Sequence, residues 1–199
     1  IITLASGINK YTPTESECQN LKDRYALKDK KISCFVGRIS QEKNVAFLVN
    51  AFKKIQQNVP ESHLILVGDG PETKKINNLV KELDLEQHIT LTGYLSKKEV
   101  FTALTIADVM LFPSKTETQG LTVVESLQCG TPVVGLNYMG VKEVLQNEQG
   151  GVLTEESTEA YAKAAIDLLT NASKVTALSK AAIQRGEDFS SHTINLKLE

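Results

Sequence analysis

The feature that most constrains this chain is the regular alternation of short β-branched runs with longer amphipathic stretches. In the longer stretches apolar residues recur at helical spacing, as at Val45, Leu48 and Phe52. The β-branched runs have the length of buried strands and lie at residues 32–37, 63–68, 89–93, 109–113, 132–135 and 150–153. Strands that alternate with helices form a parallel sheet with both faces covered. We therefore predict an α/β fold: a doubly wound, Rossmann-like parallel sheet of about six strands with helices on both faces.

Domain boundaries follow from where this alternation begins and ends. We predict three parts, at residues 1–30, 31–187 and 188–199. The first part opens with an apolar fragment that no helix precedes, so we interpret it as a segment that enters from elsewhere. The middle part is the predicted α/β domain, closed by two helices at 158–170 and 173–185. The last part is predicted to be a tail, and its final two residues fit a cloning scar.

Composition and charge exclude several classes of function. The 199 residues carry a formal net charge of -2 with dispersed lysines and arginines, so nucleic acid is not an expected partner. His63, His88 and His192 stand far apart, and no Cys or His spacing is typical of a metal site. The cysteines form no C-x-x-C pair, and no apolar stretch is long enough to cross a bilayer. We expect a cytoplasmic protein without a metal or cofactor.

Ligands of open parallel sheets bind beyond the carboxyl ends of the strands, so the loops after the strands are the candidate site. After the first strand, Arg38 and Lys43 flank the start of a helix, whose N-terminus carries partial positive charge. A phosphate group between the two cations would relieve their repulsion with the helix dipole. The alternative is a solvated pair of surface cations with Glu42 as local counter-charge. The residues alone leave both interpretations open.

After the second strand, "GDGPE" forms a predicted tight turn with Gly68 and Gly70, and Pro71 is predicted to be the first helical residue. The dinucleotide pattern G-x-G-x-x-G fails at Thr73, and the following strand ends without a carboxylate for a ribose. A nicotinamide cofactor is therefore disfavoured. A structural glycine turn is the favoured interpretation, and close approach of the backbone to a ligand is compatible with it.

After the third strand, Ser96 and Glu99 have the spacing of a capping box at a helix start. Tyr94 and Leu95 precede them. These two residues either pack within the loop or form a shelf for a flat heterocycle.

The fourth loop and its helix read "ETQGLTVVESLQCGTP" and carry two carboxylates eight positions apart, Glu117 and Glu125. Gly120 near the helix start permits a phosphate to approach free N–H groups. The inward stripe of the helix is predicted to be Leu121, Val124 and Leu127. Glu125 lies about a turn and a half into the helix, where a ribose diol would satisfy its carboxylate. The alternative is that Glu117 complements the helix dipole and Glu125 pairs with a lysine.

Together, "GRISQEKN", "GDGP", "GYL" and "ETQGLTVVESLQCGTPVV" resemble, in order and spacing, the C-terminal domain of retaining glycosyltransferases of the GT-B fold, the group 1 family. The resemblance runs from about Gly7 to Thr170, and its most specific element is the glutamate pair followed by "CGTPVV". The segments "MGVKEV", with Glu143, and "NEQGGVL" are similar to turns of that family.

The resemblance implies that residues 31–187 bind the nucleotide-diphosphate sugar, with UDP favoured as the nucleotide, for transfer of a hexose with retention. It implies catalytic roles for Arg38, Lys43 and Glu117: the two cations neutralise the departing diphosphate, and the carboxylate positions the sugar. The implied reaction uses no metal. It also implies that residues 1–30 enter from an N-terminal domain that is missing from this chain. Because acceptor-binding residues of the family belong to that domain, this fragment alone is expected to be inactive.

The resemblance also implies how the rest of the sugar donor is held. The backbone at Gly120, Leu121 and Thr122 would bind the diphosphate, and Glu125 would accept hydrogen bonds from the ribose hydroxyls. The other implied donor-binding residues are Gly37, Gly68, Tyr94 and Leu95.

Two departures from the family's pattern bear on the acceptor and on the domain crossover. Gln119 stands where an aromatic residue is common, which resembles bacterial glucosyltransferases acting on diacylglycerol and favours a lipid acceptor at the inner membrane face. Ser6 and Asn9 replace the usual Asn and Asp at the crossover between domains. A GT-B sugar-nucleotide epimerase and a non-catalytic Rossmann-like interaction domain remain as alternatives.

Overall fold

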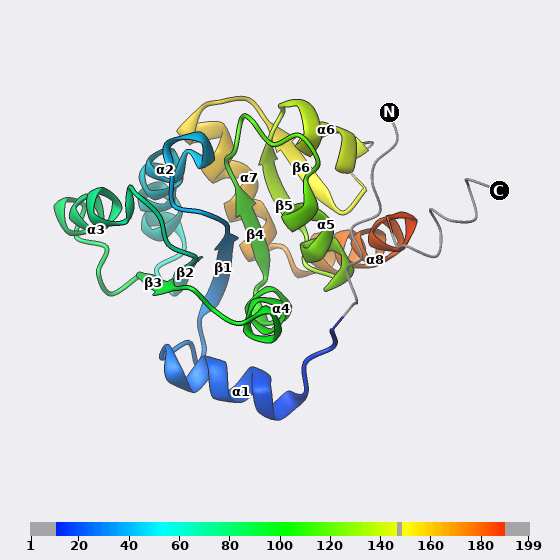
Figure 1. Ribbon diagram of the computed structural model, residues 1–199, viewed down its shortest axis with the longest axis horizontal. Coiled ribbons are helices and arrows are strands. Elements are labelled where there is room, and N and C mark those ends of the chain that lie inside the picture. Colours follow the sequence, from blue (N-terminus) through cyan, green and yellow to red (C-terminus); the bar gives the residue numbers. More distant parts are fainter. Residues whose placement is uncertain (1–10, 147–148, 190–199) are drawn as a thin grey trace.

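A six-stranded sheet with all strands parallel forms the centre of the computed structural model, which describes residues 11–146 and 149–189 (Figure 1). The strands are β1 (Lys31–Val36), β2 (Ser62–Val67), β3 (Ile89–Gly93), β4 (Val109–Phe112), β5 (Val133–Leu136) and β6 (Gly151–Thr154). Their order across the sheet is β3-β2-β1-β4-β5-β6. Every residue of β2, β4 and β5 is buried, as expected for a sheet covered on both faces. The predicted fold class is confirmed.

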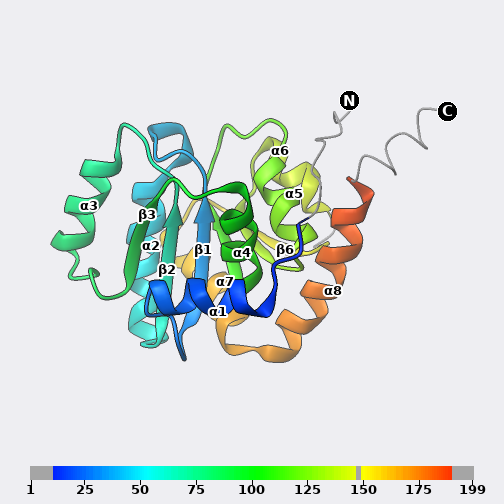
Figure 2. The same ribbon diagram turned by 60° about the horizontal axis from the view of Figure 1, so that its bottom comes forward.

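Helices cover both faces of the sheet. They are α1 (Glu15–Arg24), α2 (Val45–Asn58), α3 (Thr73–Glu82), α4 (Lys97–Ile106), α5 (Leu121–Gln128), α6 (Met139–Val144), α7 (Thr158–Thr170) and α8 (Ala172–Asp188), with the short 3-10 helix η1 at Gln41–Lys43. One face carries α2 and α7, with α3 beside α2 (Figures 1 and 2). The other carries α4 and α5, with α1 packed beside α4 and α8 beside α5.

The sheet has one point at which the winding direction reverses. From β1 the chain runs outward through β2 to β3, and it then crosses to β4 on the other side of β1. The loops that follow β1 and β4 therefore start at neighbouring strand ends and lead away from each other. Ligands of open α/β sheets bind at such a switch point.

The beginning of the described chain contains a helix that the sequence analysis did not anticipate. In α1, Thr14 accepts a hydrogen bond from the backbone N of Glu17, and the Glu17 side chain accepts one from the backbone N of Thr14, a complete capping box. The buried side chains of Leu21 and Leu27 join the hydrophobic core. The Arg24 guanidinium also lies 2.6 Å from the Glu99 carboxylate of α4. Residues 15–24 are thus packed on the α/β unit.

Several predicted helix boundaries can be compared with the structure. Ser96 and Glu99 form the predicted capping box of α4. The prediction for Pro71 was wrong, because α3 begins at Thr73 and Glu72 is its N-cap. The inward stripe of α5 was partly wrong: Val123, Val124 and Leu127 are buried, whereas Leu121 is half-buried. Ser6, Asn9 and the final ten residues lie outside the described residues.

Candidate functional site at the β1 and β4 strand ends

Two side-chain hydrogen bonds hold the β1 loop against the β4 loop at the switch point. The Asn44 side-chain amide donates to the carbonyl of Pro113 at 3.4 Å, and the Ser114 hydroxyl donates to the carbonyl of Glu42 at 3.3 Å. Asn44 has a φ of 56° and joins η1 to α2, so the chain turns sharply there. The two loops therefore form one continuous surface, although more than 60 residues separate them in the sequence.

An ion pair joins the predicted cation of the first loop to the predicted acid of the second. Lys43 Nζ lies 2.6 Å from Glu117 Oε2, and the two side chains are only 21% and 17% exposed. The Lys43 ammonium also lies 5.5 Å from the ring centroid of Phe112, the last residue of β4. The sequence left open whether a phosphate group or Glu42 would be the anion beside Lys43. In the structure that anion is the carboxylate of Glu117.

Glu117 also caps the start of α5. Its Oε1 accepts hydrogen bonds from the backbone N of Gly120 at 3.2 Å and of Gln119 at 3.4 Å. Burial acts to raise the pKa of Glu117, but the hydrogen bond and charge of Lys43, together with these N–H groups, outweigh it and lower the pKa below its usual value. Glu117 is therefore held as a carboxylate, pointing at both the cation and the helix tip.

The tip of α5 presents unpaired N–H groups. Gly120, its N-cap, has a φ of 64°, and an added Cβ would lie 2.9 Å from Cγ2 of Val144. Within the described part of the chain, the backbone N–H groups of Leu121, Thr122 and Val123 have no hydrogen-bond acceptor. Such a group of N–H donors at a helix start favours an anion. Leu121 and Thr122 were predicted here, whereas Val123 was missed.

Glu125 is half-buried on α5 and has no hydrogen-bond or ion-pair partner among the described residues. Burial raises its pKa, and the charge of Lys97 opposes that rise without an ion pair. The alternative in which Glu125 pairs with a lysine is therefore not what the structure shows. A carboxylate in this setting is stabilised only by donors from elsewhere.

Glycines bring the ends of β1 and β2 into direct backbone contact. A Cβ at Gly68, where φ is 128°, would lie 2.0 Å from the carbonyl oxygen of Gly37, and one at Gly70 would lie 2.3 Å from that of Ile39. The Asp69 carboxylate holds this turn by accepting from the Thr73 hydroxyl at 2.5 Å and from the backbone N of Gly70 at 2.7 Å. The "GDG" turn thus supports the loop that carries Arg38 and Lys43.

The remaining predicted site residues, Arg38, Tyr94 and Leu95, follow strands at the same edge of the sheet, and none of them has a hydrogen bond or ion pair with Lys43 or Glu117 within the described residues. Arg38 is exposed and has no ion pair within the described residues. Tyr94 is 78% exposed at the end of β3, and Leu95 packs against the core. β3 is three places from β4 in the sheet, but the helix that follows these two residues, α4, packs against α5.

The sequence analysis did not predict the residues whose hydrogen bonds hold the elements of the site together. Asn44 and Ser114 are ordinary loop residues in the sequence, and only the pairing of β1 with β4 brings them to the opposite loop. Gly140 was noted only as part of a family turn, yet its backbone N donates to the carbonyl of Glu117 at 3.0 Å. The glycine itself was the available signal, because a Cβ there would lie 2.6 Å from that same carbonyl oxygen.

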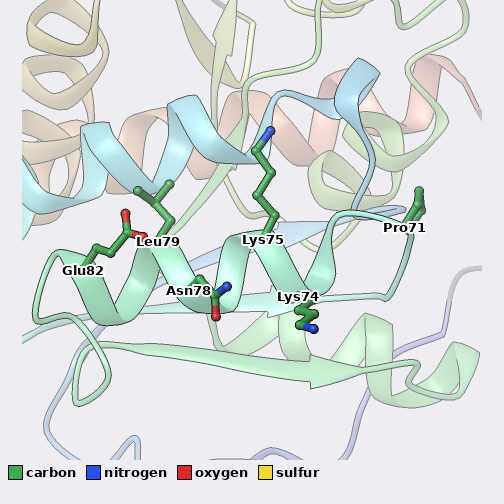
Figure 3. Close-up of a pocket in the computed structure, with 6 residues that line it drawn as sticks. All are labelled: Pro71, Lys74, Lys75, Asn78, Leu79 and Glu82. Atoms are coloured by element: carbon green, nitrogen blue, oxygen red, sulfur yellow. The ribbon is translucent and has the colours of Figure 1, made fainter.

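A separate surface cavity of about 540 Å³ lies along α3 (Figure 3). Its lining comes entirely from α3 and the turn before it, and consists of Pro71, Lys74, Lys75, Asn78, Leu79 and Glu82. In Figure 3 the side chains of Lys74 and Lys75 point in different directions from the helix. This cavity lacks the convergence of several elements that distinguishes the β1 and β4 loops.

Two further observations concern metals and membranes. Across residues 11–146 and 149–189, no group of three or more His, Cys, Asp or Glu side chains could hold a metal ion. None of the helices described by the structure has both the length and the apolar character needed to cross a bilayer.

Comparison with known proteins defines the class to which this fold and site belong. Residues 19–185 match the family described as glycosyl transferases group 1. The chain is 32% identical over 185 residues to alpha-monoglucosyldiacylglycerol synthase of Acholeplasma laidlawii, covering 90% of this chain and 46% of that protein. It is 34% identical over 171 residues to N-acetyl-alpha-D-glucosaminyl L-malate synthase of Bacillus anthracis, covering 85% and 44%. The chain belongs to the group 1 glycosyltransferase family and spans about half the length of these relatives.

Solved structures agree with this fold. Sucrose-phosphate synthase from Thermosynechococcus elongatus superposes with a TM-score of 0.84 at 25% identity, covering 98% of this chain and 49% of that one. Anabaena HepE, solved in complex with UDP and glucose, superposes with a TM-score of 0.86 at 22% identity, covering 98% and 54%. The family is one of glycosyl transferases and three of these proteins are named as synthases, so the epimerase alternative is not favoured.

Proposed function

We propose that the chain is the sugar-donor-binding half of a retaining glycosyltransferase that transfers a hexose from a UDP-sugar to an acceptor. The observation that carries the proposal is the meeting of Lys43, Glu117 and the unpaired N–H groups of α5 at the switch point. A diphosphate placed there would receive backbone hydrogen bonds from Leu121 and Thr122 and charge from Lys43.

The proposed roles are those that the family resemblance implies, and the positions of Lys43, Glu117 and Glu125 support them. Arg38 and Lys43 stabilise the charge that develops on the departing diphosphate, which is the main catalytic need of a transfer without a metal or cofactor. Glu117, beside Lys43, orients the hexose. Glu125 accepts hydrogen bonds from the two ribose hydroxyls, which supply the partners that the protein does not.

The base and the acceptor are proposed from the relatives. UDP is present in the HepE structure, whereas the name of a Mycolicibacterium smegmatis relative specifies GDP-mannose. A diacylglycerol lipid is the proposed acceptor, supported by Gln119 and by the Acholeplasma laidlawii relative. The enzyme would then act as a peripheral protein at the cytoplasmic membrane face. Because this chain spans half of its relatives, we propose that it binds the sugar donor without transferring the sugar.

Calorimetric titration with UDP tests the proposal directly. Glu125→Ala and Arg38→Ala are each expected to weaken UDP binding about tenfold, because each removes hydrogen bonds to a charged group. Lys74→Ala, which removes an exposed cation of α3, is the matched control and should bind as the unaltered chain does. Unchanged affinity in both site variants would refute the proposed function.

A second prediction concerns the stability of the chain without nucleotide. Glu125→Gln is expected to raise the melting temperature at pH 7 by roughly 2–4 °C, because the raised pKa of Glu125 means that its charged form is disfavoured in the folded state. The gain should shrink as the pH falls through the raised folded pKa towards 4.5, since the folded carboxyl then takes up a proton before the unfolded one.

Thermal unfolding monitored by circular dichroism at several pH values measures this gain. The exposed Glu86→Gln provides the control, and no comparable stabilisation is expected from it. A Glu125→Gln chain that is less stable than the parent at pH 7 would mean that the carboxylate already has partners in the protein.

A further inference from the structure

We propose that Arg185, at the C-terminal end of α8, is a positioning residue that sets the conformation of the Glu117–Gly120 loop through α6. Arg185 is distant in sequence from every residue assigned to the site, and the sequence analysis gave it no role. Its effect on nucleotide binding rests on the proposed function, whereas its effect on the loop does not.

The first step is the contact between Arg185 and the end of α6. The guanidinium Nε donates to the carbonyl of Val144 at 2.9 Å, and Nη2 donates to the carbonyl of Glu143 at 3.0 Å. These are the last two residues of α6, whose carbonyls have no partners within a helix that ends there. A cation is favoured at a helix C-terminus, so Arg185 fixes this end of α6. Its side chain is only 17% exposed.

The second step is the contact between α6 and the loop. The backbone N of Gly140 donates to the carbonyl of Glu117 at 3.0 Å, and a Cβ at Gly140 would lie 2.6 Å from that oxygen. Val144, only 2% exposed, lies so close to Gly120 that a Cβ there would be 2.9 Å from its Cγ2. The N-terminal end of α6 therefore donates a hydrogen bond to Glu117 at the start of the loop, and its C-terminal end packs against Gly120.

The third step is the attachment of α8 itself. α8 packs along α5, where a Cβ at Gly186 would lie 2.8 Å from the backbone N of Gln128. The neighbouring Ala182 is fully buried. Arg185 is thus presented from a helix that is already docked on α5. Through Arg185, α8 links α5 to α6. α6 in turn contacts the loop at the N-terminal end of α5.

This arrangement predicts a specific loss when Arg185 is replaced. In Arg185→Ala, amide hydrogen exchange at Gly140 and Gly120 is expected to become about tenfold faster, because α6 loses the donor that fixes its C-terminal end. UDP should bind about three- to tenfold more weakly, which lies within the roughly two- to thirtyfold effects of residues that act on a site through others. Uridine, which lacks the diphosphate, should bind with unchanged affinity. Arg185→Lys, which keeps one charged donor, should recover part of both losses.

The control removes a different contact of the same guanidinium, which also lies 4.6 Å from the ring centroid of Phe189. Arg185 Nη1 lies 3.3 Å from Asp188 Oδ2, and Asp188→Ala eliminates this ion pair without touching the carbonyls of α6. Both exchange and UDP affinity should match the parent in that variant. The measurements are NMR-detected exchange for the two glycines and titrations with UDP and with uridine, all on the whole chain.

The outcomes separate this proposal from the proposed function. Unchanged exchange at Gly140 and Gly120 in Arg185→Ala would overturn the positioning role. An equal loss of UDP and uridine binding would also overturn it, because a general structural effect does not distinguish the diphosphate from the nucleoside. A parent chain that binds no UDP would count against the proposed function alone, and the exchange comparison would still decide the role of Arg185.

Discussion

Replacing Lys43 with methionine is expected to weaken UDP binding about thirtyfold or more, the largest binding effect among the variants considered. The substitution keeps much of the length of the side chain but removes the charge that lies 2.6 Å from Glu117. The Glu117 carboxylate then remains half-buried without its cation, at the tip of α5 where the diphosphate is proposed to bind. Lost attraction and new repulsion therefore act in the same direction. Calorimetric titration measures the change.

A second substitution separates these two contributions. The double variant Lys43→Met with Glu117→Gln should bind UDP more tightly than Lys43→Met alone, because the repulsive carboxylate has been removed. Lys174→Met is the matched control: Lys174 also lies 2.6 Å from a carboxylate, that of Asp167, but the pair is more exposed and belongs to α7 and α8. That control should leave UDP affinity unchanged. Parental affinity in Lys43→Met would show that the diphosphate lies elsewhere.

Gly68→Ala is expected to lower the free energy of unfolding by roughly 3 kcal/mol, the largest stability effect among these variants. An alanine Cβ would lie 2.0 Å from the carbonyl oxygen of Gly37, and a φ of 128° is itself unfavourable for alanine. Relief would require the ends of β1 and β2 to move apart, although the backbone N of Gly37 donates to the carbonyl of Val67 at 3.0 Å. Urea unfolding measures the loss.

Gly93→Ala isolates the effect of backbone conformation from the effect of the clash. Gly93 also has a positive φ, of 69°, but no atom lies within 4 Å of an added Cβ. Its expected cost is about 1 kcal/mol, from the left-handed conformation alone. Equal losses for the two variants would contradict the claim that close approach of Gly37 requires the glycine at position 68.

The sequence predicted the architecture well because the relevant signals are local. Each strand was predicted to within about one residue of its observed bounds. In a chain where strands alternate with helices, a β-branched run of that length rarely forms anything but a strand. The same is true of the capping box at Ser96. For α1 the signal was present in Thr14 and Glu17 but was overlooked, because the first thirty residues had been interpreted as a single incoming segment.

The candidate site was less predictable because it is made of non-local contacts. Patterns near Lys43 and Glu117 drew attention to two loops that the structure brings together, but no pattern predicts the ion pair between these residues, which are 74 positions apart. The resemblance to a family implied roles for single residues but did not predict the hydrogen bonds and ion pairs between the loops. Asn44, Ser114 and Arg185 each act on a partner that only the assembled sheet brings within reach.

The position of β4 beside β1 also fixes when the site can exist during folding. β2 and β3 come between β1 and β4 in the sequence and lie on the other side of β1 in the sheet. Pairing β4 with β1 therefore carries the entropy cost of closing a long loop. Intermediates that contain β1, β2 and β3 alone would hold Lys43 with no carboxylate opposite it. Competence to recognise a ligand would therefore depend on the pairing of β1 with β4, a long-range contact of the kind that slows folding.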